Sequence, residues 1–428
     1  NFCTNGIICG DRTPSPKMQE VKYLYQSFRL YPGAEEIRVE NLQLFEDGSR
    51  FRLVWRLEKE GEILAKGSCR FQGAPGQVTR VPCDMKLPEE PGEYVRTASL
   101  VLAEDMAYGK AGTELCFGQS VERVDEPEKP EIPTGEEQQK PESRIRIVDG
   151  DSSFSVKGNG FLIMFQKMTG KLISYHLNGK ELVYNLADTL HPEFWRAPTD
   201  NDRGNKMPER CVMWKGASLY PKVERVDCTA KGENAVVETV YQLGQGALLQ
   251  LRYEVDADGT MSVTERYEGD KDLPELPCYG MSWKLPEDFR YVTWYGLGPE
   301  ETYSDRKQGG RLGVWKALPQ DGIAGYVRPQ ECGNHADTRW MEIRDERGNG
   351  IRIESPELFE FSVLPYTCHE LENAKHHYEL PQSYATVLRI LEAQTGVGGD
   401  NSWGAWAHEK YVLDSGKNRE FQFTVRRV

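Results

Sequence analysis

The fold class of this chain is decided by residues 249–263, which read LQLRYEVDADGTMSV. Apolar residues alternate with polar ones on both sides of Asp258-Gly259, a dipeptide that is typical of tight β-hairpin turns. The same pattern of short alternating runs and glycine-containing turns continues across residues 144–428, with no strand–helix–strand alternation. It therefore predicts one very large antiparallel sandwich of two sheets in this part of the chain.

A smaller β-sandwich is expected upstream. Residues 25–124 contain short alternating runs, such as FRLVWRL at 51–57, that are separated by turn pairs including Asp47-Gly48. Residues 125–144 hold four prolines, seven acidic residues and almost nothing apolar, a composition that predicts an exposed linker. We therefore expect the chain to divide into residues 1–24, 25–124, a linker at 125–143, and 144–428.

Charge and cysteine content narrow the class of protein. The chain has 53 basic and 67 acidic side chains in 428 residues, and the formal charge of −14 disfavours nucleic acid or anionic membranes as partners. It has no run of about 18 apolar residues, no signal-peptide pattern and ten scattered cysteines without Cys-x-x-Cys pairs. We expect a cytoplasmic chain with reduced thiols. Asn1 stands where an initiator methionine would, so we also expect a chain cut from something longer.

Two motifs are candidates for a binding site. Residues 194–204 read FWRAPTDNDRG ahead of a polar loop, and their dense opposite charges can lock that loop by bidentate pairing; the alternative is a salt-bridged turn without function. Residues 396–403 read GVGGDNSW, in which three glycines permit a close turn that leaves Trp403 at the loop tip. An exposed indole face is a suitable platform for the C–H surface of a sugar, whereas the alternative is a tryptophan folded into the core.

The remaining motifs are interpreted as structural. Residues 296–303, GLGPEETY, lack the third glycine and the following helix of a dinucleotide loop and fit a turn at the end of a strand. His335-Ala336-Asp337 and His376-His377 have no partners at zinc-like spacing. The sequence contains no Gly-x-Ser-x-Gly elbow, and no pair of carboxylates stands out, so these patterns identify no catalytic residue.

In combination and order, the motifs resemble those of the β-galactosidases of glycoside hydrolase family 2. FCTNGI at 2–7 and DRTPSP at 11–16 resemble the segment that leaves the catalytic barrel of that family. Residues 194–204, 296–306 and 396–403 stand where its terminal domain carries signatures.

A further segment, YVRPQECG at 326–333, supports the resemblance, although Cys332 replaces a usual asparagine. The resemblance covers nearly the whole chain and implies an all-β fold after a short piece of barrel. It assigns residues 1–24 to the tail end of the catalytic barrel, 25–124 to an immunoglobulin-like β-sandwich, and 144–428 to an antiparallel supersandwich that shares its fold with galactose mutarotases.

The resemblance also implies an activity, the retaining hydrolysis of terminal β-galactosides such as lactose, in which one glutamate is the nucleophile and another the acid and base. In the family both glutamates and the main magnesium ligands lie on the barrel, upstream of Phe2, so this chain would complete the sugar site and be inactive alone. The carbonyl of Phe2 and the side chain of Asn5 would help to hold a sodium ion that meets a galactosyl hydroxyl. Trp403 would stack against the sugar. The loop that moves as the site closes would begin with Arg203, Gly204 and Asn205.

The partners implied by the resemblance are a β-galactoside and the missing barrel part of the same enzyme, with a homo-oligomer as the complete form. Two other functions remain open. The terminal sandwich could be a stand-alone carbohydrate-binding module, or, by fold analogy alone, an aldose mutarotase. Mutarotation needs a positioned acid and base around a sugar ring, and the sequence assigns no such pair.

Overall fold

The computed structural model describes residues 6–125, 145–186, 189–244, 246–401 and 403–428. The chain divides into two compact units. The smaller unit comprises Lys17–Lys140 and Gln308–Val314, and the larger unit comprises Asn1–Pro16, Pro141–Lys307 and Trp315–Val428. Except for Asp125, the predicted linker lies outside the described residues.

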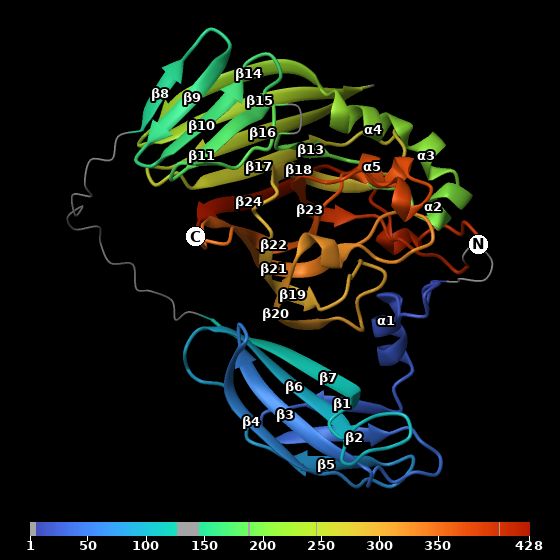
Figure 1. The fold of residues 1–428 in the computed structure, drawn as a ribbon. Helices are drawn as coiled ribbons and strands as arrows, with labels where there is room; N and C mark the ends of the chain where they lie inside the picture. Colours follow the sequence, from blue (N-terminus) through green and yellow to red (C-terminus); the bar gives the residue numbers. More distant parts are fainter. Residues whose placement is uncertain (1–5, 126–144, 187–188, 245, 402) are drawn as a thin grey trace. The chain divides into compact units, whose positions relative to one another are not determined.

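The smaller unit, in its described part, is a sandwich of a three-stranded and a four-stranded sheet (Figure 1). Its elements are α1 (Lys17–Leu24), β1 (Phe28–Pro32), β2 (Glu36–Asn41), β3 (Phe51–Lys59), β4 (Glu62–Arg70), β5 (Val78–Pro82), β6 (Gly92–Leu102) and β7 (Glu114–Val124). The strand orders are β1-β2-β5 and β4-β3-β6-β7. The alternation predicted at residues 51–57 is confirmed, because Phe51, Leu53 and Leu57 are buried in the core of this unit.

The larger unit is built, over its described residues, on a five-stranded and a twelve-stranded sheet. The five-stranded sheet contains β8 (Arg146–Asp149), β9 (Ser153–Gly158), β10 (Phe161–Gln166), β11 (Leu172–Leu177) and β12 (Lys180–Glu181). The twelve-stranded sheet contains β13 (His191–Glu193), β14 (Lys222–Lys231), β15 (Asn234–Gly244), β16 (Ala247–Val255), β17 (Met261–Glu268), β18 (Cys278–Pro286), β19 (Tyr291–Gly298), β20 (Arg311–Ala317), β21 (Asn334–Arg344), β22 (Gly350–Leu364), β23 (Ala385–Gln394) and β24 (Arg419–Arg427). Of β20, only the residues from Trp315 onward belong to the larger unit. Its main path runs β13-β18-β23-β22-β24-β17-β16-β15-β14.

The hairpin predicted around Asp258-Gly259 is formed by β16 and β17, which pair antiparallel. The turn between them has Gly259 at a φ of +80°. Tyr253 lies opposite Val263, and the inward side chains of both strands are buried in one core. The ring of Phe165 on β10 lies 4.9 Å from that of Tyr253, so the two sheets pack against each other face to face. The predicted fold class is confirmed: the chain is all-β, with a smaller sandwich followed by a large antiparallel one.

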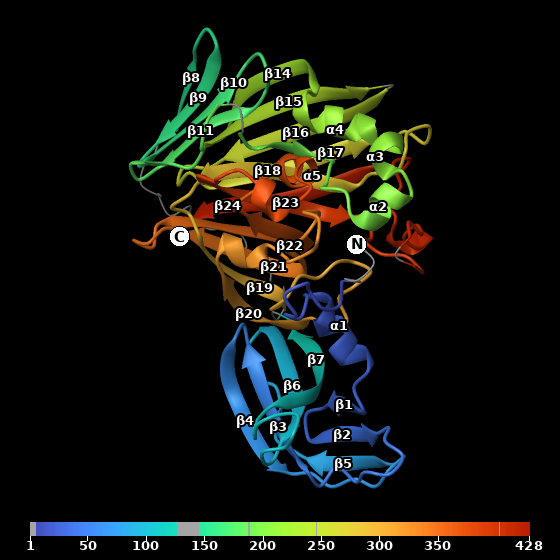
Figure 2. The same cartoon turned by 45° about the vertical axis from the view of Figure 1, so that its right-hand side comes forward.

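Short helices are the main departure from the sequence prediction. Helix α2 (Asp200–Gly204) lies within the FWRAPTDNDRG motif, and α3 (Met207–Arg210) and α4 (Val212–Leu219) occupy the stretch after residue 204 that was expected as a polar loop. The cause is a capping box, in which the side chains of Thr199 and Asp202 each accept from the backbone N–H of the other. In both Figure 1 and Figure 2, these helices and α5 (Cys368–Asn373) gather at one end of the larger unit.

Three single-turn 3-10 helices complete the described elements: η1 (Pro319–Gly322), η2 (His377–Glu379) and η3 (Glu409–Tyr411). Among the described helices, none has the length and hydropathy needed to cross a membrane. All nine cysteines of the described residues are free thiols, and five of them are buried.

Candidate functional site

Trp403 lies on the loop that follows β23, and its side chain is among the exposed ones, with 70% of the residue accessible. The side-chain oxygen of Asn401 accepts hydrogen bonds from the backbone N–H of Trp403 at 2.8 Å and of Ala405 at 3.3 Å. The turn is therefore fixed by a local Asx arrangement while the indole stays accessible. The exposure predicted for Trp403 is confirmed, and its contact with a sugar stays a prediction.

Helix α2 packs directly against the Trp403 loop through two glycines. A Cβ on Gly204 would lie 2.7 Å from the Cα of Gly404 and 2.8 Å from the carbonyl oxygen of Trp403. Gly404 has a φ of +102°, a conformation that favours glycine. Asn201 reinforces the contact, since its amide donates to the carbonyl of Asn401 at 2.9 Å. The structure thus brings together two predicted parts of the site, Trp403 and the segment that begins at Arg203.

Arg196 contacts both α2 and the loop that carries Trp403. Its guanidinium is buried and forms a fork with Asp202, with Nη2–Oδ1 at 2.8 Å and Nε–Oδ2 at 3.1 Å. It also donates to the backbone carbonyls of Thr395 and Gly396. The bidentate pairing predicted for the FWRAPTDNDRG motif is confirmed, and it ties α2 to the start of the glycine-rich loop.

A second carboxylate holds the same loop from the other side. The backbone N–H of Gly398 donates to Oδ2 of Asp305 at 2.8 Å, and a Cβ on Gly396 would lie 2.7 Å from that oxygen. Asp305 belongs to the segment after β19, where the GLGPEETY motif was expected to form a turn at a strand end. That turn is confirmed, because β19 ends at Gly298.

The other buried carboxylates of the signature segments are also paired. Glu301 accepts from Arg306, from the hydroxyl of Tyr326 and from the backbone N–H of Gly333. Both carboxylate oxygens of Glu331 accept from the Nη1 of Arg389, at 3.0 and 2.9 Å. Burial raises the pKa of Glu331, and the guanidinium of Arg389 opposes that rise. These groups hold loops in place, and their oxygens are already engaged by protein donors.

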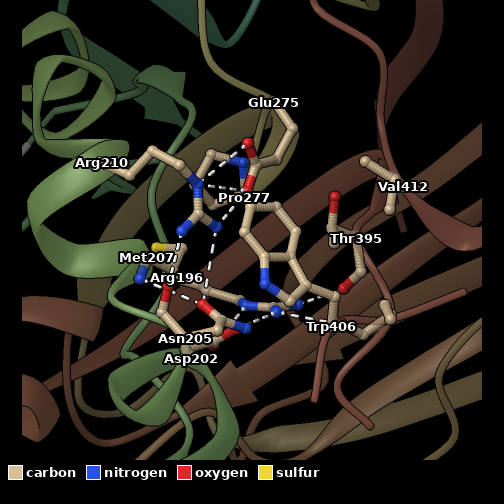
Figure 3. A pocket seen from close by; sticks show the side chains of 12 residues that line it. Arg196, Asp202, Asn205, Met207, Arg210, Glu275, Pro277, Thr395, Trp406 and Val412 are labelled. Atoms are coloured by element: carbon tan, nitrogen blue, oxygen red, sulfur yellow. Dashed lines mark hydrogen bonds and ion pairs between the residues drawn. The ribbon is translucent and has the colours of Figure 1, made fainter. Parts of the chain in front are cut away.

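Residues of α3 and of the segments around Glu275 and Trp406 line a small cavity (Figure 3). Arg210 donates to Glu275, with the Nη2–Oε1 distance at 2.5 Å, and to the carbonyl of Asn205 at 2.7 Å. The centre of its guanidinium lies 3.8 Å from the ring centroid of Trp406. The cavity volume is about 20 Å³, enough for about one water molecule and far too small for a sugar ring. The contacts of Arg210 therefore support the loop and do not form a sugar site.

The histidine motifs have structural environments, as the sequence suggested. His335 is buried, with its ring 4.2 Å from that of Trp294, and burial lowers its pKa to about 4. His376 is exposed, stacks on Tyr378 at 5.0 Å and contacts Glu379 at 3.1 Å. Within the described ranges, no group of three or more histidine, cysteine, aspartate or glutamate side chains is arranged to hold a metal ion.

Two predicted site residues cannot be placed. Phe2 and Asn5, the sodium ligands implied by the family resemblance, lie outside the described residues. The mobility expected of Arg203, Gly204 and Asn205 stays a prediction as well, although the structure shows that these residues belong to α2 and its C-terminal cap.

Several supporting residues were not found from the sequence. Asn201 and Asp202 could have been found, because Thr-x-x-Asp is a capping box that predicts a helix start after Thr199. Asp305 and Glu275 gave no such signal. Each contacts a segment more than 60 residues away in the sequence, and only the folded chain brings these contacts together.

The fold and this site define an all-β protein whose larger sandwich presents an aromatic loop tip that buried ion pairs hold in place. Comparison with protein families narrows this class. Residues 157–426 match the family described as "Beta galactosidase small chain", and residues 37–121 match "Beta-galactosidase, domain 4". The chain belongs to the β-galactosidase small chain family.

Individual relatives show how much of a longer protein the chain represents. It is 38% identical to a β-galactosidase from Halalkalibacterium halodurans, in an alignment that covers 100% of this chain and 42% of that protein. The β-galactosidase small subunit of Latilactobacillus sakei is 32% identical, with 66% of this chain and 98% of that protein aligned. The chain therefore spans about two fifths of the long relatives.

A solved structure gives a weaker likeness. A putative aldose 1-epimerase from Escherichia coli aligns with 66% of this chain and 99% of its own, at a TM-score of 0.37 and 14% identity. We draw no functional conclusion from a likeness of that size.

Proposed function

We propose that this chain is the part of a β-galactosidase that completes the sugar site, with Trp403 as the surface against which a terminal β-galactoside such as lactose lies. The observation that supports this proposal is the exposure of Trp403 on a loop with fixed supports. An accessible indole buries the apolar C–H face of a sugar while leaving the hydroxyl groups free to form hydrogen bonds.

The supports of the loop have a direct consequence for binding. Arg196 and Gly204 of residues 194–204 and Asp305 of a second segment contact the Trp403 loop, so its backbone has few alternative positions. A surface that is ordered before the ligand arrives loses less conformational entropy when it binds. The Trp403 loop is thus suited to recognition, and we assign to it positioning of the substrate.

The chemistry of hydrolysis is assigned to the part of the enzyme outside this chain. Retaining hydrolysis needs two carboxyl groups about 5–5.5 Å apart on either side of the glycosidic bond. The buried carboxylates Glu301 and Glu331 and the partly buried Asp305 are held by backbone or arginine donors and serve the fold. The sodium ion at Phe2 and Asn5 and the magnesium ion of the barrel remain part of this proposal.

Replacing Trp403 by alanine tests the proposal in the enzyme assembled from this chain and the remaining part of the protein. We expect the KM for a chromogenic galactoside to rise about tenfold, which corresponds to roughly 1.4 kcal/mol of lost binding. Steady-state kinetics at several galactoside concentrations measure this change. The isolated chain, assayed in the same way, is expected to show no turnover.

Tyr220 provides a matched control, because it is an aromatic residue with 83% exposure that lies at the end of α4. Tyr220→Ala should leave the KM unchanged. An unchanged KM in Trp403→Ala would contradict the role given to this residue. Turnover by the isolated chain would contradict the assignment of hydrolysis to the part of the enzyme outside this chain.

A further inference from the structure

Two arginines beside the Trp403 loop lack a carboxylate. Arg203 donates to the backbone carbonyls of Pro198 at 2.5 Å and Glu372 at 3.5 Å, and no ion pair within 4.0 Å is formed by it among the described residues. The Nε of Arg328 is buried without any acceptor in that same part of the chain, and Arg328 likewise forms no ion pair there. Both residues are half-buried. Other buried arginines of the larger unit, Arg196 and Arg389, each form an ion pair with a carboxylate.

The two guanidinium groups are close enough to repel each other. Burial lowers the pKa of Arg203, and the charge of Arg328 lowers it further. The backbone supports this proximity, because the side chain of Gln330, two residues from Arg328, accepts from the N–H of Asp200 at 3.2 Å at the start of α2. Helix α2 and the segment that contains Arg328 and Gln330 therefore bring two positive charges into the same neighbourhood.

The acidic residues nearby are already engaged. Asp202 forms the fork with Arg196, and Glu372 accepts from Lys215 at 2.7 Å and from the indole N–H of Trp195 at 3.0 Å. Asp200 accepts from the side chain of Gln330 at 3.3 Å. These groups reduce the repulsion between the arginines without forming a contact ion pair with either of them.

Two partly desolvated like charges are unfavourable unless an anion joins them. The planar guanidinium group fits a carboxylate particularly well, because it can donate two parallel hydrogen bonds. The chain has a formal charge of −14, so a general excess of positive charge does not explain the two neighbouring arginines. We propose that Arg203 and Arg328 together bind a carboxylate side chain from the part of the β-galactosidase outside this chain, and so dock that part beside the Trp403 loop.

The identity of the occupant rests on the proposed function and on two observations. The long relatives continue for more than half of their length beyond the region that this chain covers. Arg203 also lies on α2, which contacts the Trp403 loop through the adjacent Gly204. A carboxylate bound there would fix α2, and through it the loop, as the two parts of the enzyme assemble.

The experiment titrates this chain into the remaining part of the enzyme and follows the recovery of galactosidase activity. In the double variant Arg203→Gln/Arg328→Gln, the concentration needed for half-recovery should rise at least tenfold, and its dependence on salt should become weaker. Arg225→Gln is the matched control, because Arg225 is an exposed residue paired with Asp227 at 2.9 Å, and it should assemble like the wild type.

A structural role makes a different prediction. Because the substitutions remove a repulsion, the melting temperature of the isolated double variant should be unchanged or higher. A lower melting temperature together with normal assembly would overturn the proposal. The variant Arg203→Lys/Arg328→Lys keeps the charges but loses the forks, and intermediate assembly in it would support recognition of a carboxylate by guanidinium geometry.

Three further outcomes are decisive. If inorganic phosphate raises the melting temperature of the wild type but not of the double variant, and assembly is normal, the pair binds a small anion and the proposal is overturned. If the wild type restores no activity, the proposed function fails and this inference fails with it. If the wild type restores activity and Trp403→Ala raises the KM, normal assembly of the double variant overturns the docking proposal alone.

Discussion

Glu331 and Glu265 are both fully or almost fully buried glutamates of the larger unit, and their surroundings are opposite. Glu331, beside the Trp403 loop, accepts from the Nη1 of Arg389 with both carboxylate oxygens, at 2.9 and 3.0 Å. Glu265, on β17 in the sandwich core, has no hydrogen-bond donor to either carboxylate oxygen in the described structure, and the hydroxyl of Tyr253 nearby also lacks a partner. The end of the sandwich that presents Trp403 thus keeps its buried charges in pairs, whereas the core contains an isolated carboxyl group.

The difference has a consequence for protonation. Burial raises the pKa of Glu265 well above its ordinary value, and Glu392 raises it further. Burial without a cation therefore favours the neutral form of this carboxyl group in the folded chain. Glu331 has a charged partner, and its pairing connects segments that position the loop. The charged form of Glu331 is therefore stabilised near the site, whereas the charged form of Glu265 is disfavoured in the core.

Removing the partner of Glu331 is expected to have the largest effect on stability. Arg389→Met leaves a buried carboxylate without its cation, and loss of one member of a buried pair costs about 3–5 kcal/mol. Urea unfolding followed by tryptophan fluorescence measures this change. The signal reports on the larger unit, since Trp55 is the only one of the nine tryptophans in the smaller unit.

An exposed ion pair supplies the control for that measurement. Arg266 contacts Glu420 at 2.8 Å with both side chains more than half exposed. Arg266→Met should change the free energy of unfolding by at most about 1 kcal/mol. Equal effects of the two substitutions would show that burial does not distinguish these pairs.

Replacing Glu265 should have an effect of opposite sign and somewhat smaller size. Glu265→Met removes a buried polar group without a partner, so we expect the free energy of unfolding to increase by about 2–3 kcal/mol at pH 7. The gain should shrink as the pH falls to 4.5, because the unfolded glutamate then becomes neutral as well. Urea unfolding at both pH values measures it.

Glu268 lies on the same strand with its side chain exposed and serves as the control. Glu268→Met should change the stability by less than about 0.5 kcal/mol. A decrease in stability for Glu265→Met would mean that the carboxyl group has a stabilising contact, for example with a buried water molecule.

The location of Glu265 could have been predicted from the sequence, but the pairing of Glu331 could not. Met261, Val263, Glu265 and Tyr267 follow a period of two, so the strand pattern that decides the fold also places Glu265 on the core face. Arg389 pairs with a glutamate 58 residues away, and no local period relates them. The same distinction holds at the site. The exposure of Trp403 was predicted from the glycine-rich turn together with the family resemblance, whereas its support by Asp305 depends on contacts between distant loops.

Glu360 on β22 is intermediate between Glu331 and Glu265, because it has a hydrogen-bond donor but that donor is neutral. The amide of Asn334 donates to it at 2.9 Å, yet burial raises the pKa of Glu360 to about 7. The pKa of this acid is higher in the folded than in the unfolded state, so the stability it contributes is fully present below pH 4.5, falls as the pH rises to 7, and stays lost above that. Glu360→Gln cannot ionise, and we expect it to be more stable than the wild type by about 3 kcal/mol at pH 8, with little difference at pH 4. Urea unfolding of both proteins from pH 4 to 8 tests this expectation. A difference that does not vary with pH would show that Asn334 is as effective a partner for Glu360 as Arg389 is for Glu331.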